Sequence, residues 1–385
     1  MGNGPVVMLL LNDFTMDQRV HREATALCAA GYEVTILCLR SPGLPGEEVP
    51  DGVRVLRVAD YSTVSYRRPD RMLRQRLARS RALRDAAVGL RPWVVHCHDT
   101  ETLSAGAAAA RRTGARLVYD AHELFPDSLI DHGLRGSWPS RALWRLTEHL
   151  LVPRSDAVIT VSAGIAEVLR RRYGVHPTVV TNVPPLAPLG DRARLRRELG
   201  VRDDQVVLLY QGVLMTGRVV LPLVDVVGRL PRLVLAVQGW GPLEEALRRR
   251  ARELGVSERV FLMGKKAPEE LHGYACGADI GSTLLDPHKL NHRLARPNKL
   301  FAYLMAGVPV LATDLPEIAA VVAEEEVGVL VSDHSAEGLT RGLAGLVDDP
   351  ERRAAMGRRA RRAAERRYNW EHEQQALLQV YQGLV

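Results

Sequence analysis

Short apolar runs rich in valine, isoleucine and leucine recur along the chain, and most are followed by a stretch with helical spacing. Runs of this kind are typical of parallel strands that helices cover on both faces. In the first half they fall at residues 6–11, 33–39, 53–58, 94–98, 116–119, 157–161 and 178–181. In the second half they fall at residues 206–210, 233–237, 260–263, 279–284, 308–312 and 329–331. The pattern predicts an α/β protein with two Rossmann-like, doubly wound parallel sheets.

A proline-rich segment separates the two series of strands. It reads NVPPLAPLGD at residues 182–191, and its prolines remove backbone donors and favour an extended chain. We therefore expect an N-terminal domain at residues 1–183, a linker at 184–191 and a C-terminal domain at 192–367. Residues 368–385 carry apolar side chains at roughly helical spacing, which predicts a final helix packed against a domain surface.

Length and composition agree with this organisation. At 385 residues the chain exceeds what one hydrophobic core usually organises, and 46% hydrophobic with 25% charged residues is ordinary for a folded, water-soluble protein. The early apolar run at residues 6–11 is too short for a secretory signal or a membrane span. The four cysteines have no paired spacing, which fits a reducing compartment. We therefore expect a cytoplasmic protein.

Two arginine clusters, from Arg67 to Arg84 and from Arg352 to Arg367, contribute to the net charge of +7. No aromatic residues alternate with these arginines and no reading module is recognisable, so nucleic-acid binding is not expected. In the first cluster, Leu77 and Leu83 are among the apolar residues between the charges. Such a helix either faces solvent or rests on anionic lipid at the inner membrane surface, and both interpretations stay open.

The residues directly after each predicted strand are the candidates for chemistry, because open parallel sheets bind ligands beyond the carboxyl ends of their strands. In the N-terminal domain these residues are HCHD at 96–99 and DAHE at 120–123, which place three histidines and three carboxylates near one mouth. Histidine can bond a hydroxyl or exchange a proton near neutral pH, so His122 and His98 are candidates for ligand contact. Structural, hydrogen-bonded histidines are the alternative. No metal site is predicted, because these loops lack a His-x-x-x-His pair or a convincing cysteine partner.

In the C-terminal domain, YQGVLMTGR at residues 210–218 carries two glycines between a strand and a helix. This arrangement lets backbone amides approach a pyrophosphate, and Arg218 at the start of the helix can neutralise it. Gly239 in QGWGP also suits close backbone approach, although a tight turn explains it equally well.

The segment DPHKLNHRLARPNKLFAYLM at residues 286–305 is polar and basic before it turns into an apolar helix near Pro297. Proline in the first turn leaves amide groups free for an anion. Lys299 in that turn opposes the helix dipole unless an anion lies nearby, so a phosphate contact is predicted. Glu317 in TDLPE follows a later strand and is a candidate for binding hydroxyl groups of the same ligand.

Six stretches together resemble the retaining glycosyltransferases of family four, and the resemblance covers essentially the whole chain. They are DQRVHREATALCAAGYEVTIL, VVHCHDTETL, LVYDAHELFPDS, SDAVITVSAGIAEVL, YQGVLMTGR and RPNKLFAYLMAGVPVLATDLPEI. The resemblance implies the GT-B architecture, in which two Rossmann-like domains face a cleft and the final helix crosses back to the first domain. It implies that the C-terminal domain binds a UDP or GDP sugar and that the N-terminal domain binds the acceptor. The sugar would be transferred with its anomeric configuration kept, and neither a metal nor another cofactor would be needed.

The resemblance also assigns residues. Arg218 matches the arginine that offsets the leaving diphosphate. The lysine that usually follows it is absent, and either Lys299 or Lys265 would substitute for it. With His122 orienting the reacting sugar, the predicted catalytic residues are His122, Arg218 and Lys299. Donor contacts are predicted at Gly212, Gly217, Gly239, Asn291, His292, Asn298 and Glu317, and acceptor contacts at Asp17, Arg19, His98 and Glu123.

The chain departs from the family pattern at a pair of glutamates eight residues apart, where it has Leu294 and Ala302. The second of these glutamates binds the donor ribose in the family, so the departure concerns donor binding. A diverged protein that binds a nucleotide sugar without transferring it, or a pseudo-glycosyltransferase that couples non-sugar rings, is the alternative function. The acceptor is left open between a small molecule and a lipid-linked sugar.

Overall fold

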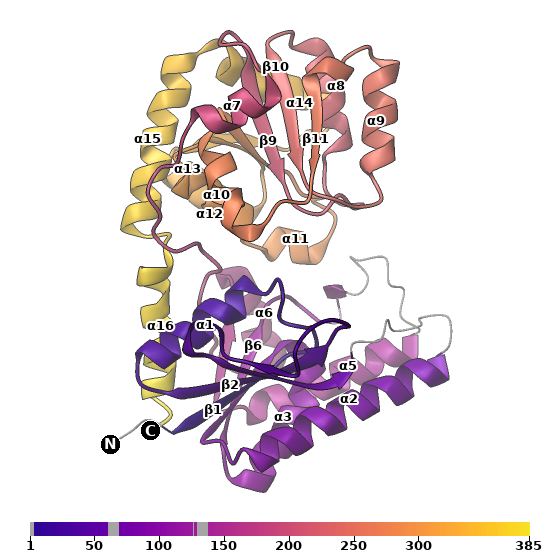
Figure 1. The fold of residues 1–385 in the computed structure, drawn as a ribbon, viewed down its shortest axis with the longest axis vertical. Helices are drawn as coiled ribbons and strands as arrows, with labels where there is room; N and C mark the ends of the chain where they lie inside the picture. The colour runs from indigo at the N-terminus through magenta and orange to yellow at the C-terminus, as the bar shows by residue number, and fades with distance from the viewer. Residues whose placement is uncertain (1–3, 61–68, 126, 129–137) are drawn as a thin grey trace. The chain divides into compact units, whose positions relative to one another are not determined.

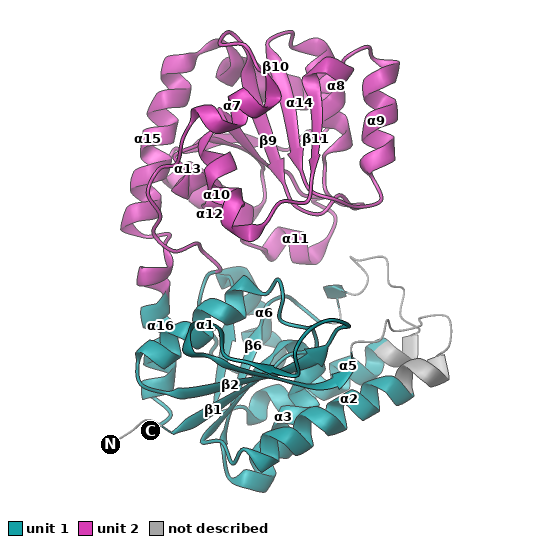
Figure 2. Cartoon of the chain, in the orientation of Figure 1, with its two compact units in different colours: residues 1–181, 374–385 teal, residues 182–373 magenta. Residues whose placement is uncertain are grey.

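The computed structural model describes residues 4–60, 69–125, 127–128 and 138–385, without the side chains of residues 69–73 and 138–140. The chain forms two compact units (Figure 2). Unit 1 comprises Met1–Thr181 together with Gln374–Val385, and unit 2 comprises Asn182–Glu373.

Unit 1 is built on an eight-stranded sheet with the order β3-β4-β2-β1-β5-β6-β7-β8. The strands are β1 (Pro5–Leu9), β2 (Glu33–Arg40), β3 (Glu47–Glu48), β4 (Arg54–Asp60), β5 (Val94–His98), β6 (Arg116–Ala121), β7 (Ala157–Thr160) and β8 (Thr178–Val179). The pairings are parallel except that of β3 with β4. Because β5 and β6 are neighbours in parallel register, the loops that follow them open at the same edge of the sheet.

The connecting helices of unit 1 are α1 (Gln18–Ala29), α2 (Pro69–Gly89), α3 (Asp99–Thr113), α5 (Trp138–Leu151) and α6 (Ala163–Tyr173), with short 3₁₀ turns at Pro50–Gly52 and Val152–Arg154. Helix α3 packs against α2 and α5 below the sheet in the view of Figure 1. Helix α1 begins at Asp17, whose carboxylate accepts a hydrogen bond from the Val20 amide.

Unit 2 is built on a six-stranded parallel sheet with the order β11-β10-β9-β12-β13-β14 (Figure 1). The strands are β9 (Val206–Gln211), β10 (Leu233–Gln238), β11 (Val260–Gly264), β12 (Ile280–Thr283), β13 (Val310–Thr313) and β14 (Gly328–Val331). The helices are α7 (Ala193–Leu199), α8 (Leu221–Arg229), α9 (Glu244–Glu253), α10 (Pro268–Cys276), α11 (Leu290–Leu294), α12 (Asn298–Met305), α13 (Pro316–Glu324), α14 (Ala336–Asp348) and α15 (Pro350–Arg366), with a 3₁₀ turn at Ser257–Arg259.

Two hydrophobic cores cover the two faces of this sheet, which explains why β9 and β10 are apolar at every position before their final glutamine. Along β9, Val207 and Leu209 belong to the core formed with α10, α12, α13 and α15. Val206 and Leu208 belong to the core formed with α8, α9 and α14. Successive side chains of a strand point to opposite faces, so both faces require apolar residues.

The last helix, α16 (Trp370–Gln382), passes from unit 2 into unit 1. Its residue Tyr381 is fully buried in unit 1, where its hydroxyl lies 2.9 Å from Nδ1 of His96 and its ring meets the edge of Tyr32. On the unit 2 side, Tyr368 just before the helix packs on Phe301.

The prediction of two doubly wound parallel sheets is confirmed, with differences at the edges. The antiparallel pair of β3 with β4 was not predicted. The predicted strand at residues 178–181 ends earlier, because β8 covers only Thr178–Val179. The carbonyl of Val180 accepts a hydrogen bond from Arg19 Nη1 at 2.8 Å, so this group is bound by a side chain instead of a neighbouring strand.

Candidate functional site

The loop after β9 is shaped by glycine. Gly212 and Gly217 have φ angles of +139° and +91°, which residues with a Cβ rarely adopt. A Cβ on Gly239, directly after β10, would lie 1.9 Å from the carbonyl oxygen of Gly212. The two loops therefore pack backbone against backbone, and Gly239 permits that close approach. This supplies a structural reason for all three glycines at the end of the sheet.

Basic side chains gather at the same loop. Lys299 Nζ lies 3.9 Å from the centre of the Tyr210 ring and would be 3.2 Å from a Cβ on Gly212. Lys289 Nζ would be 2.7 Å from a Cβ on Gly217. Burial and the neighbouring Arg218 guanidinium lower the pKa of Lys299 well below its usual range. Lys299 and Arg218 thus lie close enough for the charge of one to disfavour the charge of the other.

Within the described part of the chain, neither Arg218 nor Lys299 has a carboxylate partner or a side-chain hydrogen bond. Lys299 stands in the first turn of α12, and the residue before that helix, Pro297, provides no side-chain cap. The first amides of a helix have no partner inside the helix, and its N-terminus carries partial positive charge. The arrangement therefore favours an anion between Arg218, Lys299 and the start of α12.

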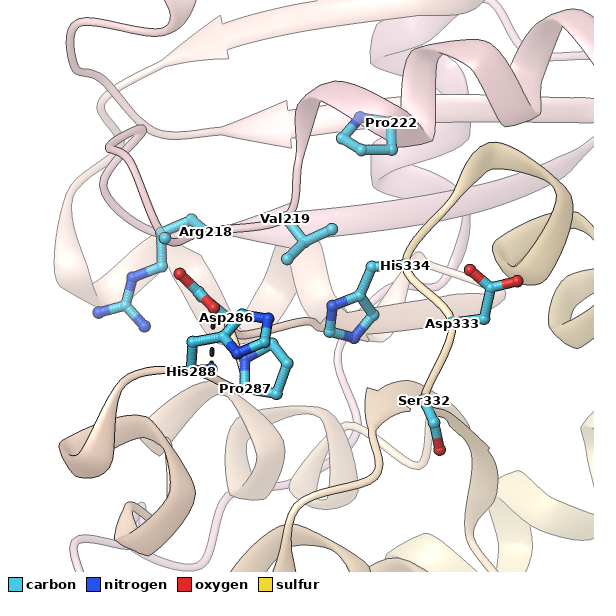
Figure 3. A pocket seen from close by; sticks show the side chains of 10 residues that line it. Arg218, Val219, Pro222, Asp286, Pro287, His288, Ser332, Asp333 and His334 are labelled. Atoms are coloured by element: carbon cyan, nitrogen blue, oxygen red, sulfur yellow. Dashed lines mark hydrogen bonds between the residues drawn. The ribbon is translucent and has the colours of Figure 1, made fainter.

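A pocket of about 430 Å³ opens beside Arg218 (Figure 3). It is lined by Gly217, Arg218, Val219, Pro222, Asp286, Pro287, His288, Ser332, Asp333 and His334. The His288 amide donates to Asp286 Oδ1 at 3.0 Å, and His334 Nε2 lies 3.0 Å from Thr313 Oγ1. Asp286, His288 and His334 were not predicted as site residues, although DPH lies in the loop after β12, where such sheets bind ligands.

The other residues predicted to contact the donor differ in burial and in their neighbours within unit 2. His292 approaches Gly217, because its Cε1 would be 3.2 Å from a Cβ there, whereas Asn291 on α11 is buried. Asn298 is exposed as the first residue of α12. Glu317 is buried and accepts a hydrogen bond from Arg296 Nε at 2.8 Å. Donor contact by these residues stays a prediction.

In unit 1, His122 is held between two carboxylates. Its Nδ1 lies 3.2 Å from Asp99 Oδ2, and its Nε2 lies 3.1 Å from Asp120 Oδ2 and 3.2 Å from His98 Nδ1. Burial lowers the pKa of His122, but the carboxylates of Asp99 and Asp120 outweigh it and raise the pKa well above its usual range. The loops after β5 and β6 are thus brought together as predicted, and the carboxylates of Asp99 and Asp120 favour the protonated form of His122.

Asp99 was missed as a separate site residue. It has a φ of +60°, a strained conformation for a residue with a Cβ, at the start of α3. Its Oδ1 accepts a hydrogen bond from the His122 amide at 3.0 Å, so it fixes both the backbone and the ring of His122. The only sequence signal was its place in HCHD. Glu123 is half-buried in the adjacent loop.

Arg19, predicted to contact the acceptor, is only 4% exposed. Its Nε and Nη2 donate to the two oxygens of Asp120 at 3.0 Å each, and Nη1 donates to the Val180 carbonyl. Burial raises the pKa of Asp120, but Arg19 and His122 outweigh it and hold the pKa well below its usual range. Arg19 thus binds the carboxylate that lies beside His122, and Asp17 caps α1. Acceptor contact by Asp17, Arg19, His98 and Glu123 stays a prediction.

The arginine cluster from Arg67 to Arg84 is only partly visible. Arg67 and Arg68 lie outside the described residues, and the side chain of Arg71 is not described. Arg76 lies 3.6 Å from Glu101 and stacks over Trp144, and Arg79 is buried. At least these two arginines are engaged within unit 1. Among the described helices, none is both long and apolar enough to cross a bilayer.

Comparison with known proteins agrees with the geometry. Residues 16–186 match the model of Glycosyltransferase Family 4, and residues 191–363 match the model of Glycosyl transferases group 1. The chain is 28% identical over 311 residues to a D-inositol 3-phosphate glycosyltransferase from Rhodococcus erythropolis, covering 75% of this chain and 67% of that protein.

Two solved structures share the fold over 99% of this chain. A sucrose-phosphate synthase from Thermosynechococcus elongatus has a TM-score of 0.82 at 19% identity, with 99% of its own chain covered. The Anabaena protein HepE in complex with UDP-glucose has a TM-score of 0.76 at 14% identity, with all of its chain covered. The family models, the relative and the paired Rossmann-like sheets together show that this chain belongs to the family-four glycosyltransferases of GT-B fold.

Proposed function

We propose that the protein transfers a sugar from a UDP or GDP sugar to a small-molecule or lipid-linked acceptor, with the anomeric configuration kept and without a metal at the diphosphate. The observation that carries this proposal is the pair of cations, Arg218 and Lys299, beside the glycine loop of unit 2. Holding two cations together without a carboxylate is unfavourable, and a diphosphate would offset both charges.

The reaction places new negative charge on the leaving nucleotide as the glycosidic bond breaks. Arg218, Lys299 and the first amides of α12 would stabilise that charge in the transition state, which is where electrostatic stabilisation accelerates a reaction. Gly212 and Gly217 would allow the backbone to approach the phosphates closely. His122 would orient the reacting sugar with its ring, which Asp99 and Asp120 hold in place.

The test is a thermal-shift panel of UDP, GDP and their sugar conjugates, followed by NMR of the product made with the best ligand. A ligand present at a hundred times its dissociation constant should stabilise its unit by about 2.7 kcal/mol. UMP and GMP, which lack the second phosphate, are the matched controls and should stabilise less. Failure of every nucleoside diphosphate to raise the melting temperature would contradict the proposal, and a product of inverted configuration would contradict retention.

A protein that binds a nucleotide sugar without transferring it is the second candidate. The observation that favours it is Ala302, half-buried on α12, at the position where the family has the ribose-binding glutamate. Binding of a nucleotide sugar without product, across the acceptors tested, would support this candidate over transfer.

Replacement of Ala302 by glutamate should strengthen donor binding. A charge-assisted hydrogen bond to ribose contributes about 1.5–3 kcal/mol, which corresponds to roughly ten- to hundredfold in the dissociation constant. Calorimetric titration with UDP and GDP measures it, and Ala302→Gln is the control that adds a similar side chain without the charge. If Ala302→Glu leaves both affinities unchanged, the ribose is not bound at this position.

A further inference from the structure

A second group of polar side chains in unit 1 is buried more deeply than His122. Glu23 on α1 and His96 on β5 are fully buried, and His98 is 3% exposed. One donor atom from each of Glu23, His96, His98 and Asp120 lies within 4.8 Å of the others. The two histidines are two residues apart on one strand, so they point to the same face, and their rings stack at 4.4 Å.

Each histidine has one ring nitrogen bound and the other directed at no partner. His96 Nδ1 lies 2.9 Å from the Tyr381 hydroxyl, and His98 Nδ1 lies 3.4 Å from Asp120 Oδ2. The Nε2 atoms of both rings are buried and have no hydrogen-bond partner among the described residues. Histidines that bind metal ions are held in this way, with the second nitrogen bonded to a carboxylate, carbonyl or similar group.

Glu23 adds a carboxylate with unused acceptors. Neither of its oxygens accepts a hydrogen bond from a described residue, although Oε1 lies 3.0 Å from Arg19 Nε. Buried polar atoms without partners are costly, and here the Glu23 carboxylate and the Nε2 atoms of His96 and His98 are all in that state. The three side chains belong to one cluster. One bound ligand that contacts the carboxylate and both imidazole nitrogens would remove this free-energy cost.

We propose that Glu23, His96 and His98 bind one divalent transition-metal ion of the zinc type, with Asp120 beside it. Two imidazoles and a carboxylate suit Zn²⁺ or Co²⁺ better than Mg²⁺ or Ca²⁺, which prefer oxygen ligands. Ligands about 2.0–2.2 Å from a zinc ion lie closer together than 4.8 Å, so small side-chain rotations would close the site. The sequence predicts no metal here because the loops lack a His-x-x-x-His pair, and Glu23 joins the two histidines only in the folded chain.

The ion would join α1 to β5, and through Tyr381 it would also fix the last turn of α16. The proposed ligands all belong to unit 1, whereas Arg218 and Lys299 belong to unit 2, so the proposed ion has a separate site and a structural role. The alternative occupant is a buried water molecule that bridges the same atoms. In that case the site would bind neither Zn²⁺ nor Co²⁺.

The test uses the full chain, stripped with a chelator and reloaded with Zn²⁺ or Co²⁺. We expect one equivalent of metal by mass spectrometry, visible absorption bands from bound Co²⁺, and a higher melting temperature in the loaded protein. Glu23→Gln and His96→Gln should lose the stoichiometric metal. His149→Gln, an exposed histidine of α5, is the matched control and should keep it.

Tyr381→Phe keeps the packing of the ring and removes only the hydroxyl that orients His96, so it tests the site even if Glu23→Gln does not fold. The affinity for Co²⁺ should fall by about 10–100-fold. Less than a tenth of an equivalent bound by the reloaded wild type, or unchanged affinity in Tyr381→Phe and Glu23→Gln, would overturn the proposal in favour of water. Because UDP and GDP binding by the stripped protein is measured separately, failure here leaves the proposed function testable.

Discussion

Replacement of Arg218 by glutamine should lower kcat for sugar transfer by about 10²–10³-fold, with a smaller change in KM. The reason is that the negative charge opposite Arg218 grows as the leaving diphosphate departs, so the guanidinium stabilises the transition state more than the bound donor. Arg218 has no carboxylate partner among the described residues, so its charge is available to the donor. Steady-state kinetics with the preferred nucleotide sugar measures the effect.

The matched control is Arg229→Gln, at the end of α8 in the same unit. Arg229 pairs with Glu337 on the surface, where both side chains are about half exposed, and its loss should leave kcat unchanged. Lys299→Met should also lower kcat. If Arg218→Gln keeps kcat within about threefold of wild type, the leaving group is not stabilised at this edge of the sheet.

Replacement of Arg19 by methionine should destabilise unit 1 by about 3–5 kcal/mol, because it removes a buried cation that pairs with two buried carboxylates. Asp120 and Glu23 are both fully buried, and Arg19 lies 3.0 Å from an oxygen of each. Methionine fills much of the same space, so the loss reports the charge rather than a cavity. Urea unfolding followed by circular dichroism gives the free energy of unfolding.

Arg54→Met provides the comparison for this second prediction. Its ion pair with Glu47 is about half exposed on both sides, and exposed pairs contribute about 0–1 kcal/mol. The double variant Arg19→Met with Asp120→Asn should recover part of the loss, because one unpaired charge is removed with its partner. Equal free energies of unfolding for Arg19→Met and Arg54→Met would show that the buried network is not a source of stability.

Much of the fold was predictable because it depends on local patterns. The run VVLLY of β9 alternates between two cores, so it had to be apolar throughout, and the sequence predicts a buried strand without knowledge of its neighbours. Gly212 and Gly217 were identifiable for a similar reason, since glycine between a strand and a helix is a local signal of unusual backbone angles.

The candidate site was predictable only in part. Arg218, Lys299 and His122 were predictable from their places in the loops and first helical turn after predicted strands. The residues that each of them contacts were not. The spacing of residues along the chain did not show that Arg19 donates its hydrogen bonds to Asp120 and Val180. It also did not show that Tyr381, near the end of the sequence, contacts His96. Glu317 likewise meets Arg296, a residue that had no predicted role.

The sequence by itself determined two parallel sheets, their glycine loops and the family. Hydrophobic periodicity and the residue types of a loop depend only on residues that are close together in the sequence. Only the tertiary structure decided which polar groups are paired and which are not. Pairing depends on which strand ends and helices meet in space, and burial then sets the cost of every unmatched charge. That is why Lys299 beside Arg218, and Glu23 beside His96 and His98, became visible only in the folded chain.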